Sequence, residues 1–447
     1  MSLLDTFRVP TELEPEVKNS FRREQWTEMS MPLATGLLEG GFVAVLAAKA
    51  FDAQPWMIAV ISAASMFGNL SSFFWNRLAM GRAKVPLVTA LQLVVLGCVA
   101  AIALSPRSIL GGWILVGAVV VSRLLIAGII TLRSIAWSLN YDRSLRARIT
   151  GRLQATTSLM IVLATGLGSL LLDSHPESFR WLYATGLLAG SVGIWAYSGV
   201  SLQGEKRHQV MERRSGRDSL GRNNFLAILR SDPHYARYQW FQFISGLGAM
   251  MLEPPLVYLI SKQIGANYAT SIGIVLIIPF LLNFTTIHLW ARYFDRVHVS
   301  EFRARQNALW VIGTLVMFWG AFSLSLVWLA AGRFLTSLVN AGGTLAWQLG
   351  HNDFAPQEQL SAYMGVHVTL TGVRGAIAPF AGMALYLGWD ANGHLPGSTG
   401  LGVWLFFLSA ILGMVAWRGF VRAAAGYGKT GFGRRSPCIG VKSPDQL

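Results

Sequence analysis

The chain has 447 residues, of which 53% are hydrophobic and only 13% are charged, whereas soluble domains average about 25% charged residues. Apolar runs close to twenty residues long recur along most of the sequence, and each can cross a bilayer core of about 30 Å. These totals exclude an ordinary soluble domain and predict a helical protein that crosses the membrane many times. The net charge of +15 does not indicate nucleic-acid binding, because the basic residues are scattered over short segments between apolar runs and no soluble domain remains to carry such a site.

Twelve membrane spans are predicted in chain order, at 29–50, 55–76, 85–104, 110–138, 150–172, 179–200, 238–261, 267–289, 305–325, 326–349, 361–387 and 400–420. They divide into two sets of six around the largest polar gap. The expected organisation is therefore an N-terminal segment (1–28), a six-helix bundle (29–200), a central loop (201–237), a second six-helix bundle (238–421) and a basic tail (422–447). Within the central loop, residues 223–230 could form an amphipathic helix on the membrane surface or a docked turn of a flexible linker.

The basic residues lie mainly on one side of this topology. The loops on the other side hold only Lys49, Arg107, Arg180 and Lys262, whereas the N-terminal segment, the central loop and the tail are rich in Lys and Arg. Positive residues in short loops mark the cytoplasmic side. We therefore expect both termini to be cytoplasmic and the protein to be a multi-pass protein of a plasma membrane, the bacterial inner membrane.

The two halves of the sequence repeat each other. The pattern R-x-L-x10-A-W-x-L begins at Arg123 and again at Arg333, and a W-x-R pattern ends both span two and span eight. Glu39 in span one and Glu253 in span seven are separated by nearly the same number of residues as the two copies of these patterns. Repeated halves that carry binding groups near the middle of the membrane are typical of secondary transporters.

With these features the chain resembles the major facilitator superfamily over about residues 28–421. The family motif between spans two and three reads roughly G-x-L-A-D-R-x-G-R-R, and residues 76–84 keep its Leu, Ala and final Lys84 but have Met80 at the acidic position. The copy after span eight keeps Asp295 and Arg296. The resemblance implies an all-α integral membrane protein of two pseudo-symmetric six-helix bundles, with spans one, four, seven and ten around a central cavity.

Ionisable residues within the spans are the candidates for substrate binding or proton coupling. A charge at the bilayer centre costs roughly 2.5–3.5 kcal/mol on insertion scales, so such residues usually face the protein interior or water. The candidates are Glu39, Arg123, Glu253, Arg374 and Arg333. Each also has a structural interpretation: Arg123 could pair with Glu39 or Glu253, and Arg374 could form a bridge.

Six charged residues near the cytoplasmic ends of the spans are predicted to take part in gating. They are Arg77, Lys84, Arg133, Arg292, Asp295 and Arg296. Arg133 precedes Trp137 by one helical turn, about 6 Å along the helix. An alternative role for Arg133 is therefore to snorkel: its backbone would lie within the span while its guanidinium group reaches the cytoplasmic membrane–water interface.

The predicted function is secondary active transport of a small organic solute by alternating access, coupled to protons, with Arg123 or Arg374 as candidates to hold an anionic group. The alternative is a transporter-like scaffold or assembly factor without transport activity, which the degenerate first motif motivates. No catalytic Ser/His/Asp arrangement, ligand-spaced metal cluster or phosphate-binding G-x-x-x-x-G-K-[ST] motif occurs, so neither an enzyme, a metal site nor a cofactor is predicted. The expected partners are the solute, protons and the lipid bilayer, and the chain is expected to act as a monomer.

Overall fold

A computed structural model describes residues 13–214, 225–356, 359–388 and 400–429, which form helices joined by short connections. The first half contains α2 (Pro15–Thr35), the 3-10 turn η1 (Gly36–Leu38), α3 (Gly40–Ala50), α4 (Pro55–Ala79), α5 (Lys84–Ala103), α6 (Ile109–Asn140), α7 (Arg143–Ser174) and α8 (Phe179–Ser198). Two short helices follow, α9 (Glu205–Arg214) and α10 (Phe225–Ser231).

The second half contains α11 (Pro233–Tyr258), the π-helix η4 (Leu259–Gln263), α12 (Tyr268–Ile272), the π-helix η5 (Gly273–Ile277), α13 (Ile278–Phe294), α14 (Val299–Phe322), α15 (Leu326–Leu349), α16 (Leu360–Leu387) and α17 (Trp404–Lys429). Each of the twelve predicted spans falls on one of these long helices or on helical segments joined end to end. By length and hydropathy alone, seven helices of the described chain could cross a membrane, or eight if the bent pair in the first span is counted.

The first span is broken in the middle. Its two parts, α2 and α3, meet at an angle of 45°, and Glu39 between them has an extended backbone with φ −62° and ψ 133°. The helix also starts at Pro15, upstream of the predicted boundary at residue 29. As a result α2 carries acidic residues of the predicted N-terminal segment into the bundle.

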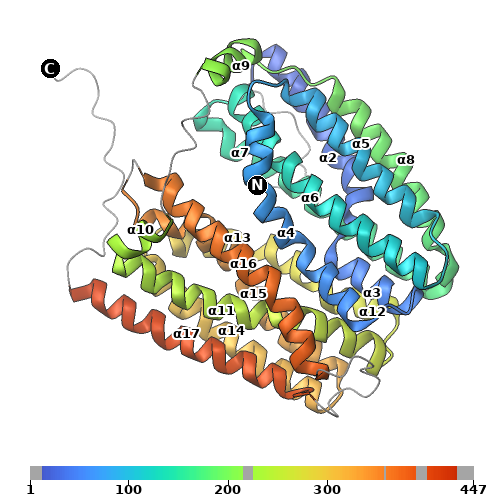
Figure 1. Cartoon of the computed structure of the whole chain (residues 1–447), viewed down its shortest axis with the longest axis vertical. Helices are drawn as coiled ribbons and strands as arrows, with labels where there is room; N and C mark the ends of the chain where they lie inside the picture. The colour runs from blue at the N-terminus through green and yellow to red at the C-terminus, as the bar shows by residue number, and fades with distance from the viewer. Residues whose placement is uncertain (1–12, 215–224, 357–358, 389–399, 430–447) are drawn as a thin grey trace.

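The two halves form two bundles that diverge toward the end that carries α9 and α10, which we call the linker end (Figure 1). The bundles pack against each other where α4 lies along α16 and where α3 contacts α11 and α12. Of the predicted segment 223–230, the first two residues lie outside the described part of the chain; the others belong to the helix α10, whose Ile228 is buried against the second bundle.

Polar contacts join the bundles at the opposite end, which we call the far end. Asp52 after α3 forms an ion pair with Lys262 of η4. Asp173 of α7 accepts a hydrogen bond from the Ala269 backbone N–H of α12 at 3.0 Å. Lys49 lies over the ring of Tyr268, with Nζ 5.2 Å from the ring centroid. Contacts from α7 and from the C-terminal end of α3 therefore converge on η4 and α12.

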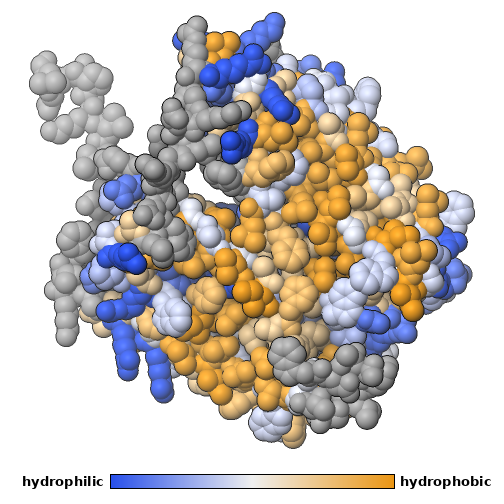
Figure 2. All heavy atoms as spheres, in the orientation of Figure 1, coloured by the Kyte–Doolittle hydropathy of each residue, from blue (hydrophilic) through white to orange (hydrophobic). Residues whose placement is uncertain are grey.

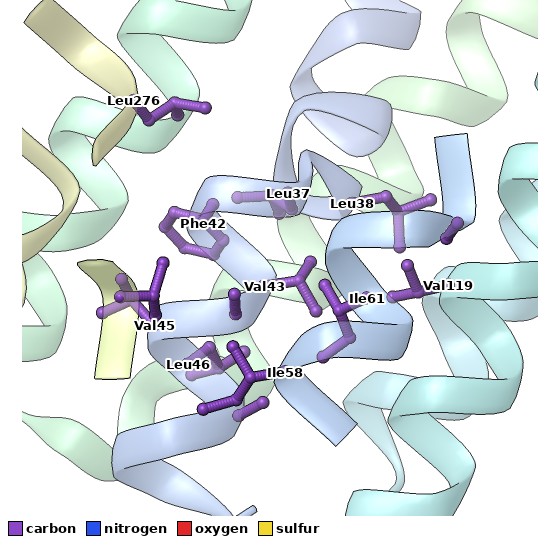
Figure 3. Close-up of a cluster of buried hydrophobic side chains, with 14 of the residues drawn as sticks. Leu37, Leu38, Phe42, Val43, Val45, Leu46, Ile58, Ile61, Val119 and Leu276 are labelled. Carbon is purple, nitrogen blue, oxygen red and sulfur yellow. The ribbon is translucent and has the colours of Figure 1, made fainter. Parts of the chain in front are cut away.

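An apolar cluster lies beside these polar contacts. Phe42, Val45 and Leu46 of α3 are buried with Leu276 of η5, which belongs to the second half (Figure 3). A Cβ atom added at Gly41 would lie 3.2 Å from Leu276 Cδ1. Small residues permit such close approach of helices within a membrane, so the far end is packed tightly across the two bundles.

The sides of the helices expose large apolar side chains. Leu167 is 65% exposed, Leu188 70% and Trp195 73%. Hydrophobic residues spread broadly over the helix sides, and hydrophilic residues gather toward the ends (Figure 2). A soluble monomer rarely exposes so large an apolar surface, so this surface fits lipid and agrees with an all-α integral membrane fold.

Candidate functional site

Arg123 of α6 binds the residues at the break in the first span. Where a helix is interrupted, its last carbonyl groups lose their intrahelical partners. Arg123 Nη2 donates a hydrogen bond to the Leu38 carbonyl at 2.6 Å and lies 3.0 Å from Glu39 Oε2, and Nη1 donates to Glu39 Oε1 at 3.2 Å. The guanidinium group therefore neutralises the glutamate and satisfies a backbone acceptor in one arrangement.

The second half repeats this arrangement. Arg333 of α15 donates from Nη1 to Glu253 Oε1 at 2.8 Å and from Nη2 to Glu253 Oε2 at 3.2 Å. Its Nη2 also donates at 3.0 Å to the Val275 carbonyl, which belongs to the π-helix η5. In both halves the arginine thus meets a carboxylate and an irregular backbone segment. The Glu253 side chain is more open, at 40% exposure against 24% for Glu39.

Four of the five candidate binding residues are thereby brought together as two ion pairs, and Arg374 of α16 has a different environment. A cavity of about 560 Å³ lies between α4 of the first bundle and helices α11, α13, α14, α15 and α16 of the second. Arg374 lines this cavity, and its Nη1 donates a hydrogen bond to the Gln242 carbonyl of α11. Glu39, Arg123, Glu253 and Arg333 are not among the described residues that line it.

A second arginine, Arg303 of α14, lines the same cavity. Its Nη1 donates to Gln306 Oε1 at 2.8 Å and its Nη2 to the Gly343 carbonyl at 3.4 Å. In the sequence, Arg303 lies just before predicted span nine, which begins at residue 305, and it is not among the predicted site residues. Its helix begins at Val299, so Arg303 lies one turn inside the bundle. The only sequence signal that Arg303 lies within the helix would have been a helical pattern that extends upstream of residue 305.

The predicted gating residue Arg133 is enclosed within the first bundle. It forms ion pairs with Glu24 and Glu28, which lie one turn apart on α2, and with Glu24 the distance is 3.7 Å. Its guanidinium carbon lies 4.9 Å from the centroid of the Trp137 ring. Tyr141 Oη donates to Glu24 Oε1 at 3.1 Å. Arg133 is therefore held by carboxylates and an aromatic ring within the first bundle.

The predicted gating residue Lys84 is fully buried and binds the central linker. Its Nζ lies 2.7 Å from Glu212 Oε2 of α9 and donates to the Ala79 carbonyl at 2.7 Å. The same Glu212 oxygen accepts the Gly81 backbone N–H at 2.8 Å. Glu205, at the other end of α9, accepts the Lys84 backbone N–H at 2.7 Å. The loop after α4 has Met80 where the related motif has an acid, and a carboxylate from α9 lies against this loop instead.

Replacing Glu212 with glutamine is expected to release α9 from the loop, because Lys84 would be left buried with no carboxylate at its ammonium group and a buried unpaired charge is costly. Limited trypsin digestion of the purified protein should then cut within residues 205–214 several-fold faster than in the wild type. The matched control is Lys206→Arg, a change at an exposed position of the same helix that keeps the trypsin site. Equal digestion rates for Glu212→Gln and wild type would show that this carboxylate does not hold the helix.

The other predicted gating residues are exposed at the linker end. Arg77 lies at the end of α4 and lines a surface pocket of about 430 Å³ together with Glu212 and Arg213. Arg292 lies in the last turn of α13 in the second bundle, and Asp295 and Arg296 directly follow that helix. The structure thus distributes the predicted gating residues over three different environments.

Comparisons with known proteins place the fold. No protein-family model matches the sequence, and no curated protein matches it. Among solved structures, a mutant of the nucleoside transporter NupG has a TM-score of 0.71 at 8% identity, covering 90% of this chain and 99% of that one. A POT family transporter in complex with a thioalcohol-conjugated peptide has a TM-score of 0.64 at 11% identity, covering 93% and 96%. A D-xylose-proton symporter has a TM-score of 0.61 at 12% identity, covering 90% and 96%.

These sequence identities are too low for residue roles in those proteins to be assigned to this chain. The structural similarity nevertheless extends over nearly the whole of each chain. The predicted fold class is therefore confirmed: the chain has the all-helical, two-bundle fold of these solved transporter structures.

Proposed function

We propose that the protein is a secondary active transporter that moves a small organic solute across a plasma membrane by alternating access. The observation that carries this proposal is the cavity between α4 and the second bundle, which is lined by residues of both halves of a repeated fold. A solute bound there would contact both bundles, so a change in their packing would change the side from which it is accessible.

The contacts at the far end support the assignment of the structure to one conformational state of the transport cycle, in which the outer side is closed. Basic residues concentrate at the linker end, and by the rule that positive loops are cytoplasmic this end would face the cytoplasm, as both chain termini would. The far end, with the Asp52–Lys262 ion pair and the apolar cluster around Phe42 and Leu276, would then be the closed outer side. Transport would require these contacts to separate while the linker ends approach each other.

Glu39 and Glu253 are the groups that we assign to proton coupling. Each is paired with an arginine, and protonation of the carboxylate would remove the attraction that holds the pair. Each arginine also contacts the irregular backbone of a span, Leu38 in the first half and Val275 in the second. Binding of a proton would therefore loosen the attachment of one helix to another, which is a physical route from protonation to bundle movement.

Reconstituted liposomes that enclose a pH-sensitive dye test this proposal. Addition of a transported solute to wild-type protein should change the internal pH, whereas Glu253→Gln should bind the solute but move few or no protons. Glu177→Gln is the matched control, because Glu177 belongs to an exposed pair with Arg107 outside the cavity. A solute flux that depends on neither the pH gradient nor the membrane voltage would refute proton coupling. A stable copurifying partner with no flux in a broad solute screen would favour the scaffold alternative.

A further inference from the structure

We propose that the transported solute is an organic anion with two negative charges, held by the guanidinium groups of Arg303 and Arg374. This inference rests on the proposed function and names its substrate class. The two arginines come from α14 and α16 and line one cavity. Among the described residues that line this cavity there is no aspartate and no glutamate.

The contrast with the other arginines buried in the helices carries the argument. Arg123, Arg133 and Arg333 are each paired with at least one carboxylate at close range. A buried charge without a partner is costly, so proteins pair such charges or use them to bind ligands. Arg303 and Arg374 are only 8% and 4% exposed, and no ion pair with an acid is found for either within the described parts of the chain. The missing negative charge is the one that a bound anion would supply.

The hydrogen-bonding groups of the two arginines are also incompletely used. The Nε atoms of both Arg303 and Arg374 are buried and have no hydrogen-bond partner within the described structure. Buried polar groups are normally hydrogen-bonded. Carboxylate and phosphate oxygens accept hydrogen bonds from guanidinium groups in the bidentate geometry that these donors offer.

Two glycines make room for the arginines. A Cβ atom added at Gly246 of α11 would lie 2.1 Å from Cζ of Arg374, so the guanidinium group lies directly against the backbone of that helix. A Cβ atom at Gly343 of α15 would lie 2.8 Å from Nε2 of Gln306, the side chain that accepts a hydrogen bond from Arg303. The positions of both cationic groups therefore depend on residues of neighbouring helices as well as on their own.

The rest of the lining indicates what else the solute contains. Asn69 of α4, Asn283 of α13 and Asn340 of α15 offer neutral hydrogen-bonding groups, and Trp310 and Trp347 offer apolar surfaces. Neutral amides and aromatic rings suit a short carbon skeleton with polar substituents. An inorganic cation or a cationic amine would meet two positive charges and no carboxylate among these side chains.

Equilibrium binding to the purified full-length protein in detergent tests the proposal, with succinate, glycerol 3-phosphate, succinamide and choline as probes. We expect succinate or glycerol 3-phosphate to bind the wild type, and whichever binds more tightly identifies the headgroup as carboxylate or phosphate. Succinamide, which has the shape of succinate without its charge, should bind at least about tenfold more weakly, since a hydrogen bond to a charged group contributes about 1.5–3 kcal/mol and each 1.4 kcal/mol is a factor of ten. Choline should not bind.

Variants then assign the site. Arg303→Gln and Arg374→Gln should each weaken dianion binding by about 10- to 100-fold. Arg305→Gln should leave it unchanged, because Arg305 lies on the same helix but is exposed and paired with Glu301. Arg374→Lys should keep part of the affinity, because it keeps the charge but loses the bidentate geometry.

Two results would overturn the proposal: no binding of either dianion to the wild type, or equal binding of succinate and succinamide. Both are measured on unaltered protein, so a variant that fails to fold does not affect them. If anions bind but no liposome flux occurs with any of them, the site stands and the transport function fails. If a neutral solute is transported while dianions do not bind, the transport function stands and the anion site fails.

Discussion

Replacing Arg123 with glutamine should destabilise the protein by about 3–5 kcal/mol, the range observed when one partner of a buried ion pair is removed. The variant leaves the Glu39 carboxylate without its cation and the Leu38 carbonyl without its donor, at the break of the first span. The measurement is thermal unfolding of the purified protein in detergent, followed by loss of the monodisperse peak on size-exclusion chromatography.

The double variant Glu39→Gln/Arg123→Gln separates the two contributions. It removes both charges, so it should be more stable than Arg123→Gln alone, and the remaining deficit reports the backbone hydrogen bond to Leu38. Arg333→Gln, the repeat counterpart, should cost less because Glu253 is 40% exposed and water can solvate its charge. A melting profile of Arg123→Gln that coincides with the wild type would show that the pair contributes nothing to the fold.

The second large effect is expected for Arg133→Gln. This change leaves two carboxylates, Glu24 and Glu28, one turn apart on α2 and almost fully buried, with side-chain exposures of 1% and 7%. Loss of the shared cation removes their attraction and leaves their mutual repulsion, so the loss of stability should again be about 3–5 kcal/mol. Arg305→Gln, which breaks only an exposed pair one turn apart, should cost no more than about 0.5 kcal/mol.

The same variant should respond to pH in a defined direction. A carboxylate that has lost its cation can accept a proton instead, and protonation removes the buried charge. The destabilisation of Arg133→Gln relative to wild type should therefore shrink as the pH falls from about 8 toward about 5. A deficit that is independent of pH would indicate that lost packing of the arginine on Trp137, rather than uncompensated charge, causes the effect.

The interaction of α9 with the loop after α4 illustrates a limit of motif comparison. Met80 occupies an acidic position of the related motif, and from the sequence alone the charge is simply missing. In the structure Glu212, 128 residues from Lys84 in the chain, accepts hydrogen bonds from Gly81 of that loop and from Lys84 at the start of α5. A contact of this kind depends on where the linker docks, and no local pattern encodes it.

The sequence by itself determined the twelve spans, the division into six and six, the repeat, and the set of charged residues placed in the spans. These features are local: apolar length decides what can cross a bilayer, and a repeat is visible as residue spacing. It also placed Glu39, Arg123, Glu253 and Arg333 in matching positions of the two halves. Only the tertiary structure decided that these four residues neutralise each other in two pairs.

The tertiary structure alone also placed Arg303 in the lining of the cavity that Arg374 lines. The physical reason is that the role of a charged side chain in a membrane protein depends on the groups around it, and these groups lie on other helices. The same residue type is a structural partner where a carboxylate faces it and, as we propose for Arg303 and Arg374, a binding group where none does.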